Sequence, residues 1–245
     1  MKVSVFTDYE SLSGFVADEM NNQLLAKPNA VICVASGNSP KRCCELFTEK
    51  VKNNGTDISQ FFFVGLDEWG GLGPATPGSC HYDFITRLFE PLQLPSSQYH
   101  VFNGLADDLQ QECVLMDKII AEKNGIDLMI VGIGMNGHIG FNEPGVDLNL
   151  LSHVIDLDET TKTVGQKYFT EKMELRKGIT LGLGHLLNAK KVLLMANGSA
   201  KAEVIKKAAE GEVSSSFPAS IMQQHPNGWL VVDEAAASLL TSVRP

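Results

Sequence analysis

Residues 30–40 decide the fold, and they read AVICVASGNSP. The first six are apolar or small, which predicts a buried β-strand over Ala30–Ala35. The next five, Ser36–Pro40, favour a tight turn, and the proline is typical of the first turn of a helix. A buried strand that runs through a tight turn into a helix is the repeating unit of parallel sheets. The stretch therefore predicts an α/β protein.

The alternation of strands and helices continues on both sides of this unit. Short apolar runs predict strands over residues 2–6, 30–35, 61–66, 128–131, 153–157, 179–183, 191–195 and 229–232. The stretches between them predict helices over residues 9–27, 40–53, 79–89, 106–123, 161–169, 200–209 and 234–240. This order predicts a single domain over residues 1–245. Its fold is a doubly wound, mainly parallel sheet with helices on both faces, as in Rossmann-like proteins.

The composition excludes several classes of protein. The chain is 44% hydrophobic and 20% charged, which is typical of a globular protein. Its net charge of −9 argues against a nucleic-acid partner, because such proteins present a basic face. No apolar run is long enough to span a membrane, so we expect no membrane partner. The 5 cysteines have no CxxC spacing and the histidines no metal-binding spacing, which predicts a cytoplasmic protein without a metal site.

Two segments follow expected strands at the edge where doubly wound sheets bind their ligands. Ser36–Pro40 leads into a helix N-terminus, whose free N–H groups and dipole favour an anion such as phosphate. Asp67–Trp69 follows a buried strand, where desolvation raises the pKa of a carboxylate and makes Asp67 a candidate general base. Each segment also has a plainer interpretation, as a capped turn or a surface turn.

A third segment, Gly132–Glu143, begins with GIGMNG, a literal GxGxxG motif. A dinucleotide site needs a helix directly after these glycines, and two glycines and a proline within residues 138–145 disfavour one. We therefore expect no nicotinamide cofactor. The segment instead presents Asn136, His138 and Glu143. A histidine beside a carboxylate can exchange a proton near neutral pH, and the plainer alternative is a loop histidine bonded to backbone.

Four motifs occur in a characteristic order along the chain: SGNSP at 36–40, LDEW at 66–69, GIGMNGHIGFNEP at 132–144 and GSAK at 198–201. In order and spacing they resemble the glucosamine-6-phosphate deaminases, from Ala30 to Asp233. Further details resemble the galactosamine-6-phosphate deaminase/isomerase branch of that family. They are Trp69, PGSC at 77–80, GITLGL at 178–183 and PAS at 218–220.

The resemblance implies a role for each matching residue. Asp67 is expected to move a proton from C2 to C1 of the open-chain sugar, and His138 to open the pyranose ring with Asn136 and Glu143 as orienting partners. Some members carry Asp in place of Asn136, so here Glu143 supplies the negative charge. The expected phosphate ligands are Ser36, Gly37, Asn38, Ser39, Lys167 and Lys201. Lys167 aligns with a position that is often Arg, and Lys offers a point charge instead of a planar fork.

The implied activity converts glucosamine 6-phosphate or galactosamine 6-phosphate into ketohexose 6-phosphate and ammonium. It implies a small sugar phosphate as the partner and no cofactor, and it leaves a homo-oligomer open. One alternative with the same fold is a 6-phosphogluconolactonase-type hydrolase, whose relatives usually show Asp-Glu-Arg where this chain has DEW. Another is a non-catalytic sugar-phosphate sensor. Related sensors carry an N-terminal DNA-binding domain, for which the residues before Ala30 leave no room.

Overall fold

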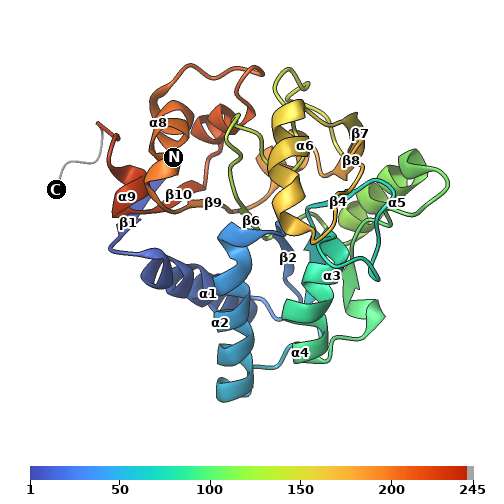
Figure 1. Cartoon of the computed structure of the whole chain (residues 1–245). Coiled ribbons are helices and arrows are strands. Elements are labelled where there is room, and N and C mark those ends of the chain that lie inside the picture. The colour runs from blue at the N-terminus through green and yellow to red at the C-terminus, as the bar shows by residue number, and fades with distance from the viewer. Residues whose placement is uncertain (242–245) are drawn as a thin grey trace.

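Seven parallel strands form the central sheet of the computed structural model, which describes residues 1–241 (Figure 1). Their spatial order is β1(Lys2–Phe6), β10(Gly228–Asp233), β9(Val192–Ala196), β6(Leu128–Val131), β2(Val31–Val34), β3(Phe62–Gly65) and β5(Tyr99–His100). In register, Val34 of β2 pairs with Gly65 of β3 on one side and with Ile130 of β6 on the other. The predicted doubly wound, mainly parallel sheet is confirmed.

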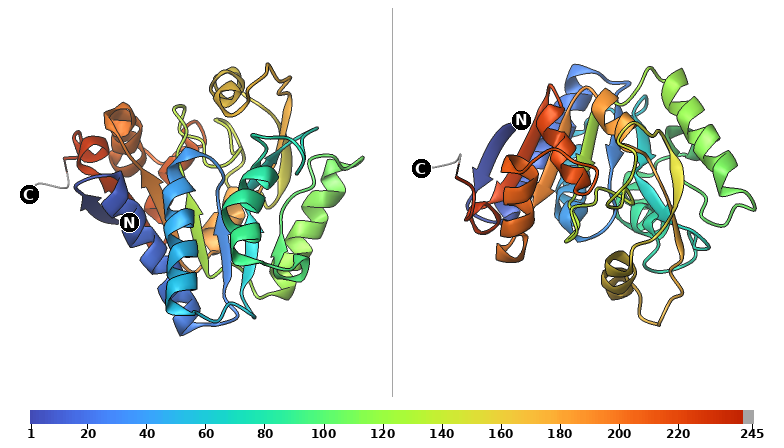
Figure 2. Two further views of the ribbon diagram at one scale, coloured as in Figure 1. Left: turned by 60° about the horizontal axis from the view of Figure 1, so that its bottom comes forward. Right: turned by 90° about the horizontal axis from the view of Figure 1, so that it is seen from above.

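Helices cover both faces of this sheet, as Figure 2 shows. The strands explain why, because their side chains alternate between two hydrophobic cores. In β2, for example, Ile32 faces one core and Cys33 the other. The Ile32 core is covered by α1(Tyr9–Ala26), α2(Asn38–Asn54), α3(Cys80–Phe84), the π-helical turn η1(Ile85–Phe89) and α4(Glu90–Leu92). The Cys33 core is covered by α5(Leu109–Glu122), α7(Leu183–Asn188), α8(Ala202–Glu210), η5(Pro218–Gln224) and α9(Glu234–Ala237).

A second, smaller sheet corrects the expected pairing of two strands. The predicted strands 153–157 and 179–183 appear as β7(His153–Asp156) and β8(Lys177–Thr180), outside the parallel sheet. β8 pairs antiparallel with β7 on one side and with β4(Asp67–Trp69) on the other, and β4 is a segment for which no strand was predicted. Leu66 joins the two sheets, because its N–H bonds Val34 of β2 and its carbonyl accepts from Leu181. A strand pattern predicts an extended chain and leaves its partner unspecified, which is why the pairing was wrong.

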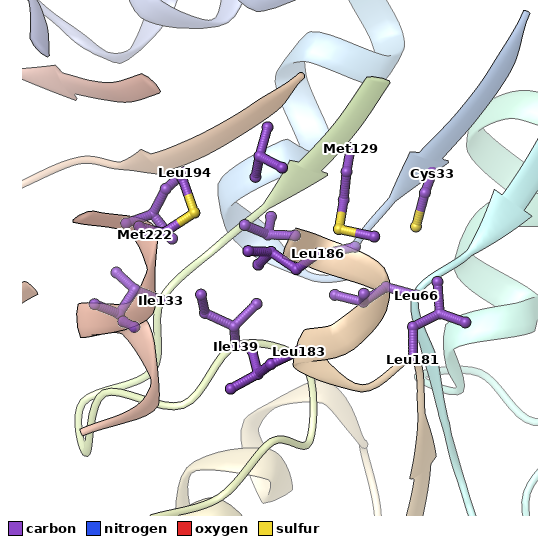
Figure 3. Packing of buried hydrophobic residues seen from close by; sticks show 14 of the residues in the cluster. Cys33, Leu66, Met129, Ile133, Ile139, Leu181, Leu183, Leu186, Leu194 and Met222 are labelled. Carbon is purple, nitrogen blue, oxygen red and sulfur yellow. The ribbon is translucent and has the colours of Figure 1, made fainter. Parts of the chain in front are cut away.

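The Gly-rich segment after β6 is anchored in the Cys33 core. Figure 3 shows Ile133 and Ile139 among the buried side chains that also include Leu183, Leu194 and Met222. Ile133 is 5% exposed and Ile139 is 1% exposed. Because two buried isoleucines hold the segment, the polar residues between them occupy fixed positions at the end of the sheet.

All five cysteines of the chain are free thiols, and each of them is buried. Within residues 1–241, no helix is both long enough and apolar enough to cross a membrane. The same part of the chain contains no group of three or more His, Cys, Asp or Glu side chains that could hold a metal ion.

Candidate active site

A cavity lies where the winding of the sheet changes direction. From β2 the chain proceeds to β3 and β5 on one side, and it then returns to the other side through β6, β9 and β10. Ligands of doubly wound sheets bind at the carboxyl ends of the strands that flank such a switch point. Here the segments that follow β2 and β6 both line a cavity of about 730 Å³.

The structure gathers most of the predicted site residues around this cavity. The predicted residues in its lining are Ser36, Gly37, Asn38, Ser39, Asp67, His138, Lys167 and Lys201. The other two, Asn136 and Glu143, do not line the cavity but contact His138. Asn136 accepts the backbone N–H of His138, and Glu143 contacts its imidazole. The cavity therefore combines Ser36–Ser39, called the phosphate loop after the ligand predicted for it, with a carboxylate, an imidazole and two lysines.

His138 is held by a network on its Nδ1 side. Nδ1 lies 3.2 Å from Oε2 of Glu143 and 3.0 Å from the hydroxyl of Thr161. The Asn136 amide donates to the same Glu143 oxygen at 3.0 Å. Burial raises the pKa of Glu143, but hydrogen bonds from His138, Thr161 and Asn136 outweigh burial and leave this pKa below its usual value. A charged Glu143 favours the tautomer with the proton on Nδ1, which leaves Nε2 as a proton acceptor.

The glycines after β6 serve close packing in this structure. A Cβ atom added to Gly134 would lie 2.3 Å from Nε2 of His138, so only a glycine lets the imidazole rest against this backbone. Gly137 has a φ of +85°, and a Cβ there would lie 2.4 Å from the ring of Phe217. Two glycines of the GxGxxG motif thus leave room for the rings of His138 and Phe217.

Asp67 and Glu68 point to opposite sides of β4. Asp67 lines the cavity and is 8% exposed, and its Oδ1 is buried without a hydrogen-bond partner among residues 1–241. Burial, and then the charge of Glu68, raise the pKa of Asp67 to about 7. Glu68 faces away and accepts the backbone N–H groups of Cys80 at 3.0 Å and His81 at 2.8 Å, which fixes the start of α3. Asp67 therefore combines a position in the cavity lining with a raised pKa, whereas Glu68 anchors the start of α3.

Two lysines line the cavity from different elements. Lys201 ends η4(Ser199–Lys201), the turn after β9, and Lys167 lies in η3(Gln166–Tyr168). Burial, and then the charge of Lys167, lower the pKa of Lys201 to about 8, so the two ammonium groups lie close enough to repel each other. Nζ of Lys201 donates to the carbonyl of Ile133 at 2.5 Å. An anion bound beside both lysines relieves their repulsion.

Several lining residues escaped the sequence analysis. Thr161, in α6(Glu159–Gly165), contacts His138 although it lies outside every motif. Tyr168 places its hydroxyl 3.0 Å from the position of a Cβ on Gly37. Asp83 and Arg87 also line the cavity. Their spacing of four residues in a predicted helix signals an ion pair, but it does not reveal which surface the pair faces.

Comparisons with known proteins identify the family of the chain. The family model for glucosamine-6-phosphate isomerases/6-phosphogluconolactonase matches residues 9–232. Proteins named glucosamine-6-phosphate deaminase from Thermoanaerobacter pseudethanolicus and Rhodopirellula baltica are each 38% identical over 241 residues. The alignments cover 98% of this chain and 95% and 96% of those proteins, respectively.

Solved structures of proteins from this family share the fold of the chain. A structure described as a monomeric glucosamine-6-phosphate deaminase superposes with a TM-score of 0.94 at 34% identity, and the match covers 98% of this chain and 100% of that one. The 6-phosphogluconolactonase of Trypanosoma brucei has a TM-score of 0.78 at 17% identity over 98% of both chains, which shows a shared fold. The chain therefore belongs to the glucosamine-6-phosphate isomerase/6-phosphogluconolactonase family.

Proposed function

We propose that this chain deaminates and isomerises a 2-amino-2-deoxyhexose 6-phosphate, giving a ketohexose 6-phosphate and ammonium. The observation that carries the proposal is one cavity that holds a buried carboxylate, Asp67, and an oriented imidazole, His138, beside the phosphate loop. Relatives named glucosamine-6-phosphate deaminase, 38% identical over nearly the whole chain, support the same reaction. Lactone hydrolysis lacks comparable support, because the lactonase structures are similar in fold alone.

Ring opening is the step that we assign to His138. Glu143 holds the proton on Nδ1, so Nε2 can accept the proton of the C1 hydroxyl. His138 then delivers this proton to the ring oxygen, the bond between C1 and the ring oxygen breaks, and the aldehyde forms. Asn136 and Thr161 keep the Glu143–His138 pair in place through their own hydrogen bonds. Transfer by such a positioned group accelerates a proton-transfer step by roughly 10²–10⁴-fold.

Asp67 carries the isomerisation. Its carboxylate removes the proton from C2 and returns it to C1. The C1 oxygen gains a proton as the amino nitrogen loses one, so the amino aldehyde becomes a C2 imine of the ketose. Water adds to this imine and ammonium leaves, so amino sugar phosphate and water give ketose phosphate and ammonium. A pKa of about 7 leaves Asp67 charged on the alkaline side of neutrality and still basic enough to accept the proton. These steps use side chains alone, and we propose no cofactor.

The phosphate group provides the binding energy that orients the sugar. We propose that the backbone and hydroxyl groups of Ser36–Ser39 hold it together with Lys167 and Lys201. All of these residues line the same cavity as Asp67 and His138. Because the phosphate is remote from C1 and C2, its contacts can fix the reacting carbons without taking part in the chemistry.

The first experiment measures ammonium release and ketose 6-phosphate formation in parallel. Glucosamine 6-phosphate and galactosamine 6-phosphate are tested separately, and the ratio of the two rates identifies the preferred epimer. We expect Asp67→Asn to lower kcat by roughly 10²–10⁴-fold. Asp18→Asn is the matched control, because Asp18 forms a surface ion pair with Lys50. Absence of ammonium from both sugars contradicts the proposal, and lactone hydrolysis by the same preparation then supports the hydrolase alternative.

We further propose that one domain over residues 1–245 performs the reaction in the cytoplasm. The support for this location is the set of five free, buried thiols, since such thiols persist in a reducing compartment. A homo-oligomer stays a prediction, and the solved relative with a TM-score of 0.94 is described as monomeric.

A further inference from the structure

Three residues form a closed ring of contacts in the wall of the cavity. The N–H of Gly37 donates to Oδ2 of Asp83 at 3.3 Å, and Nη1 of Arg87 donates to the carbonyl of Gly37 at 3.0 Å. Nη2 of Arg87 closes the ring with Oδ1 of Asp83 at 2.6 Å. Side chains of α3 and η1 therefore hydrogen-bond both the backbone N–H and the carbonyl of Gly37, which belongs to the phosphate loop.

The ring brings two opposite charges into the lining of the cavity. The side chains of Asp83 and Arg87 are each 20% exposed, and both line the cavity that holds Lys167 and Lys201. Burial raises the pKa of Asp83, and its contacts with Arg87 and Gly37 oppose this rise. The Asp83 carboxylate, which is partly buried, thus lies beside the Ser36–Ser39 groups that we expect to bind the phosphate.

The Asp83 carboxylate accepts a hydrogen bond at the N-terminus of α2, which is a position where proteins bind anions. Gly37 is the N-cap of α2, where an N–H group and the helix dipole attract negative charge. The hydroxyl of Tyr168 also lies beside this residue, 3.0 Å from the position that a Cβ on Gly37 would take. A carboxylate oxygen of the protein therefore accepts the hydrogen bond of the Gly37 N–H. A phosphate that enters the loop needs the same donor, and two anions cannot share it without strong repulsion.

We propose that Arg87 is a further phosphate-binding residue and that Asp83 is the carboxylate which it exchanges for the substrate's phosphate. On binding, the Gly37 N–H and the Arg87 guanidinium pass from the Asp83 carboxylate to phosphate oxygens. The guanidinium suits this exchange, because its planar fork matches a carboxylate and a phosphate equally well. The inference rests on the proposed function, since it needs a phosphate at Ser36–Ser39.

The test measures the affinity for inorganic phosphate by titration calorimetry at one pH, without turnover. Asp83→Asn removes the competing charge and keeps an oxygen for the Gly37 N–H, so we expect phosphate to bind about tenfold more tightly. Arg87→Gln removes a charged donor, so we expect binding about tenfold weaker. Arg42→Gln is the matched control, because Arg42 pairs with Glu10 and lies outside the cavity lining. We expect the affinity of this variant to equal that of the wild type.

The opposite signs of the two effects separate exchange from a structural clamp. If the ring only holds the loop in shape, both variants weaken phosphate binding, and that result overturns the inference. Unchanged affinity in both variants also overturns it. Where Arg87→Gln fails to fold, Arg87→Lys keeps a positive charge and should bind phosphate more weakly than the wild type.

Turnover separates this inference from the proposed function. Ammonium release by the wild type, together with any overturning result above, refutes the inference alone. A wild type that neither binds phosphate nor releases ammonium refutes both. In the expected case, Arg87→Gln raises KM for the sugar phosphate by about tenfold and changes kcat little, because its contact is far from the reacting carbons.

Discussion

At the scale of single residues, Asp67 and Lys201 set the pH range of the proposed reaction. Asp67 must be charged to remove a proton, and its pKa is raised to about 7. Lys201 must be protonated to hold the phosphate, and its pKa is lowered to about 8. We therefore expect kcat/KM to rise with pH through about 7 and to fall through about 8. A pH–rate profile checks this bell shape, and Lys201→Met should abolish the alkaline limb while lowering the maximum.

The same carboxylate should cost the folded protein stability. The pKa of Asp67 is higher in the folded chain, about 7, than its ordinary value of 3.8. The raised pKa means that the folded state favours protonated Asp67. This contribution to the free energy of unfolding is fully present below pH 3.8 and is lost as the pH rises through about 7. Asp67→Asn removes the buried charge, so at pH 8 its Tm should exceed that of the wild type by about 2–8 °C. Thermal melting at pH 5 should show a smaller difference, and an equal or lower Tm at pH 8 contradicts the argument.

Gly134 gives a steric prediction at the same scale. A Cβ at this position would lie 2.3 Å from Nε2 of His138. We expect Gly134→Ala to displace the imidazole and to lower kcat by roughly 10²-fold, because a proton acceptor acts only within hydrogen-bond reach. Gly14→Ala is the control, since a Cβ there meets no atom within 4 Å. Equal activities of the two variants would show that His138 tolerates the shift.

Individual residues differed in how far the sequence could identify them. Asp67 and His138 each lie next to a predicted strand and within a motif, so local signals were enough to select them. Thr161, Asp83 and Arg87 reach the cavity from helices that no local pattern aims at it. Their positions depend on how α6, α3 and η1 pack, which is a property of the whole fold and not of a sequence window.

At the scale of elements, the strand β4 couples the base to the helix α3. Glu68, 1% exposed, accepts the N–H groups of Trp69, Cys80 and His81. Glu68→Ala leaves these three buried donors without an acceptor, so we expect the free energy of unfolding to fall by about 2–5 kcal/mol. Urea denaturation measures this loss. Glu174→Ala is the comparison, because the ion pair of Glu174 with Arg176 is exposed and should contribute less than about 1 kcal/mol.

Helices and strands were predictable to different degrees. Apolar runs located the buried strands of the parallel sheet, since four or more consecutive buried residues leave a clear local signal. The pairing of β7 and β8 depends on Leu66, which passes the chain from one sheet to the other, and no periodicity encodes that contact. The predicted helix 79–89 is confirmed as α3 and η1, but its π-helical turn left no sequence signal.

At the scale of the whole molecule, the order of the strands places the cavity. Both segments that flank the switch point were selected from the sequence, because alternation of strands and helices already implies a ligand edge. The net charge of −9 gave no hint that Lys167, Lys201 and Arg87 all line one cavity. Composition averages over the surface, whereas binding depends on the few charges that the fold brings together.

Because all five thiols are buried, the rate at which each cysteine is chemically labelled reports how often the structure around it opens. A thiol reagent reacts with a buried cysteine only while the surrounding element is open, so each labelling rate measures the free energy of one opening event. The reporters lie in β2, α2, α3 and α5 and are Cys33, Cys43, Cys44, Cys80 and Cys113. Cys80 alone among them lines the cavity. Inorganic phosphate should therefore slow the labelling of Cys80 more than that of Cys113, and mass spectrometry of the labelled peptides would follow the filling of the cavity without any turnover.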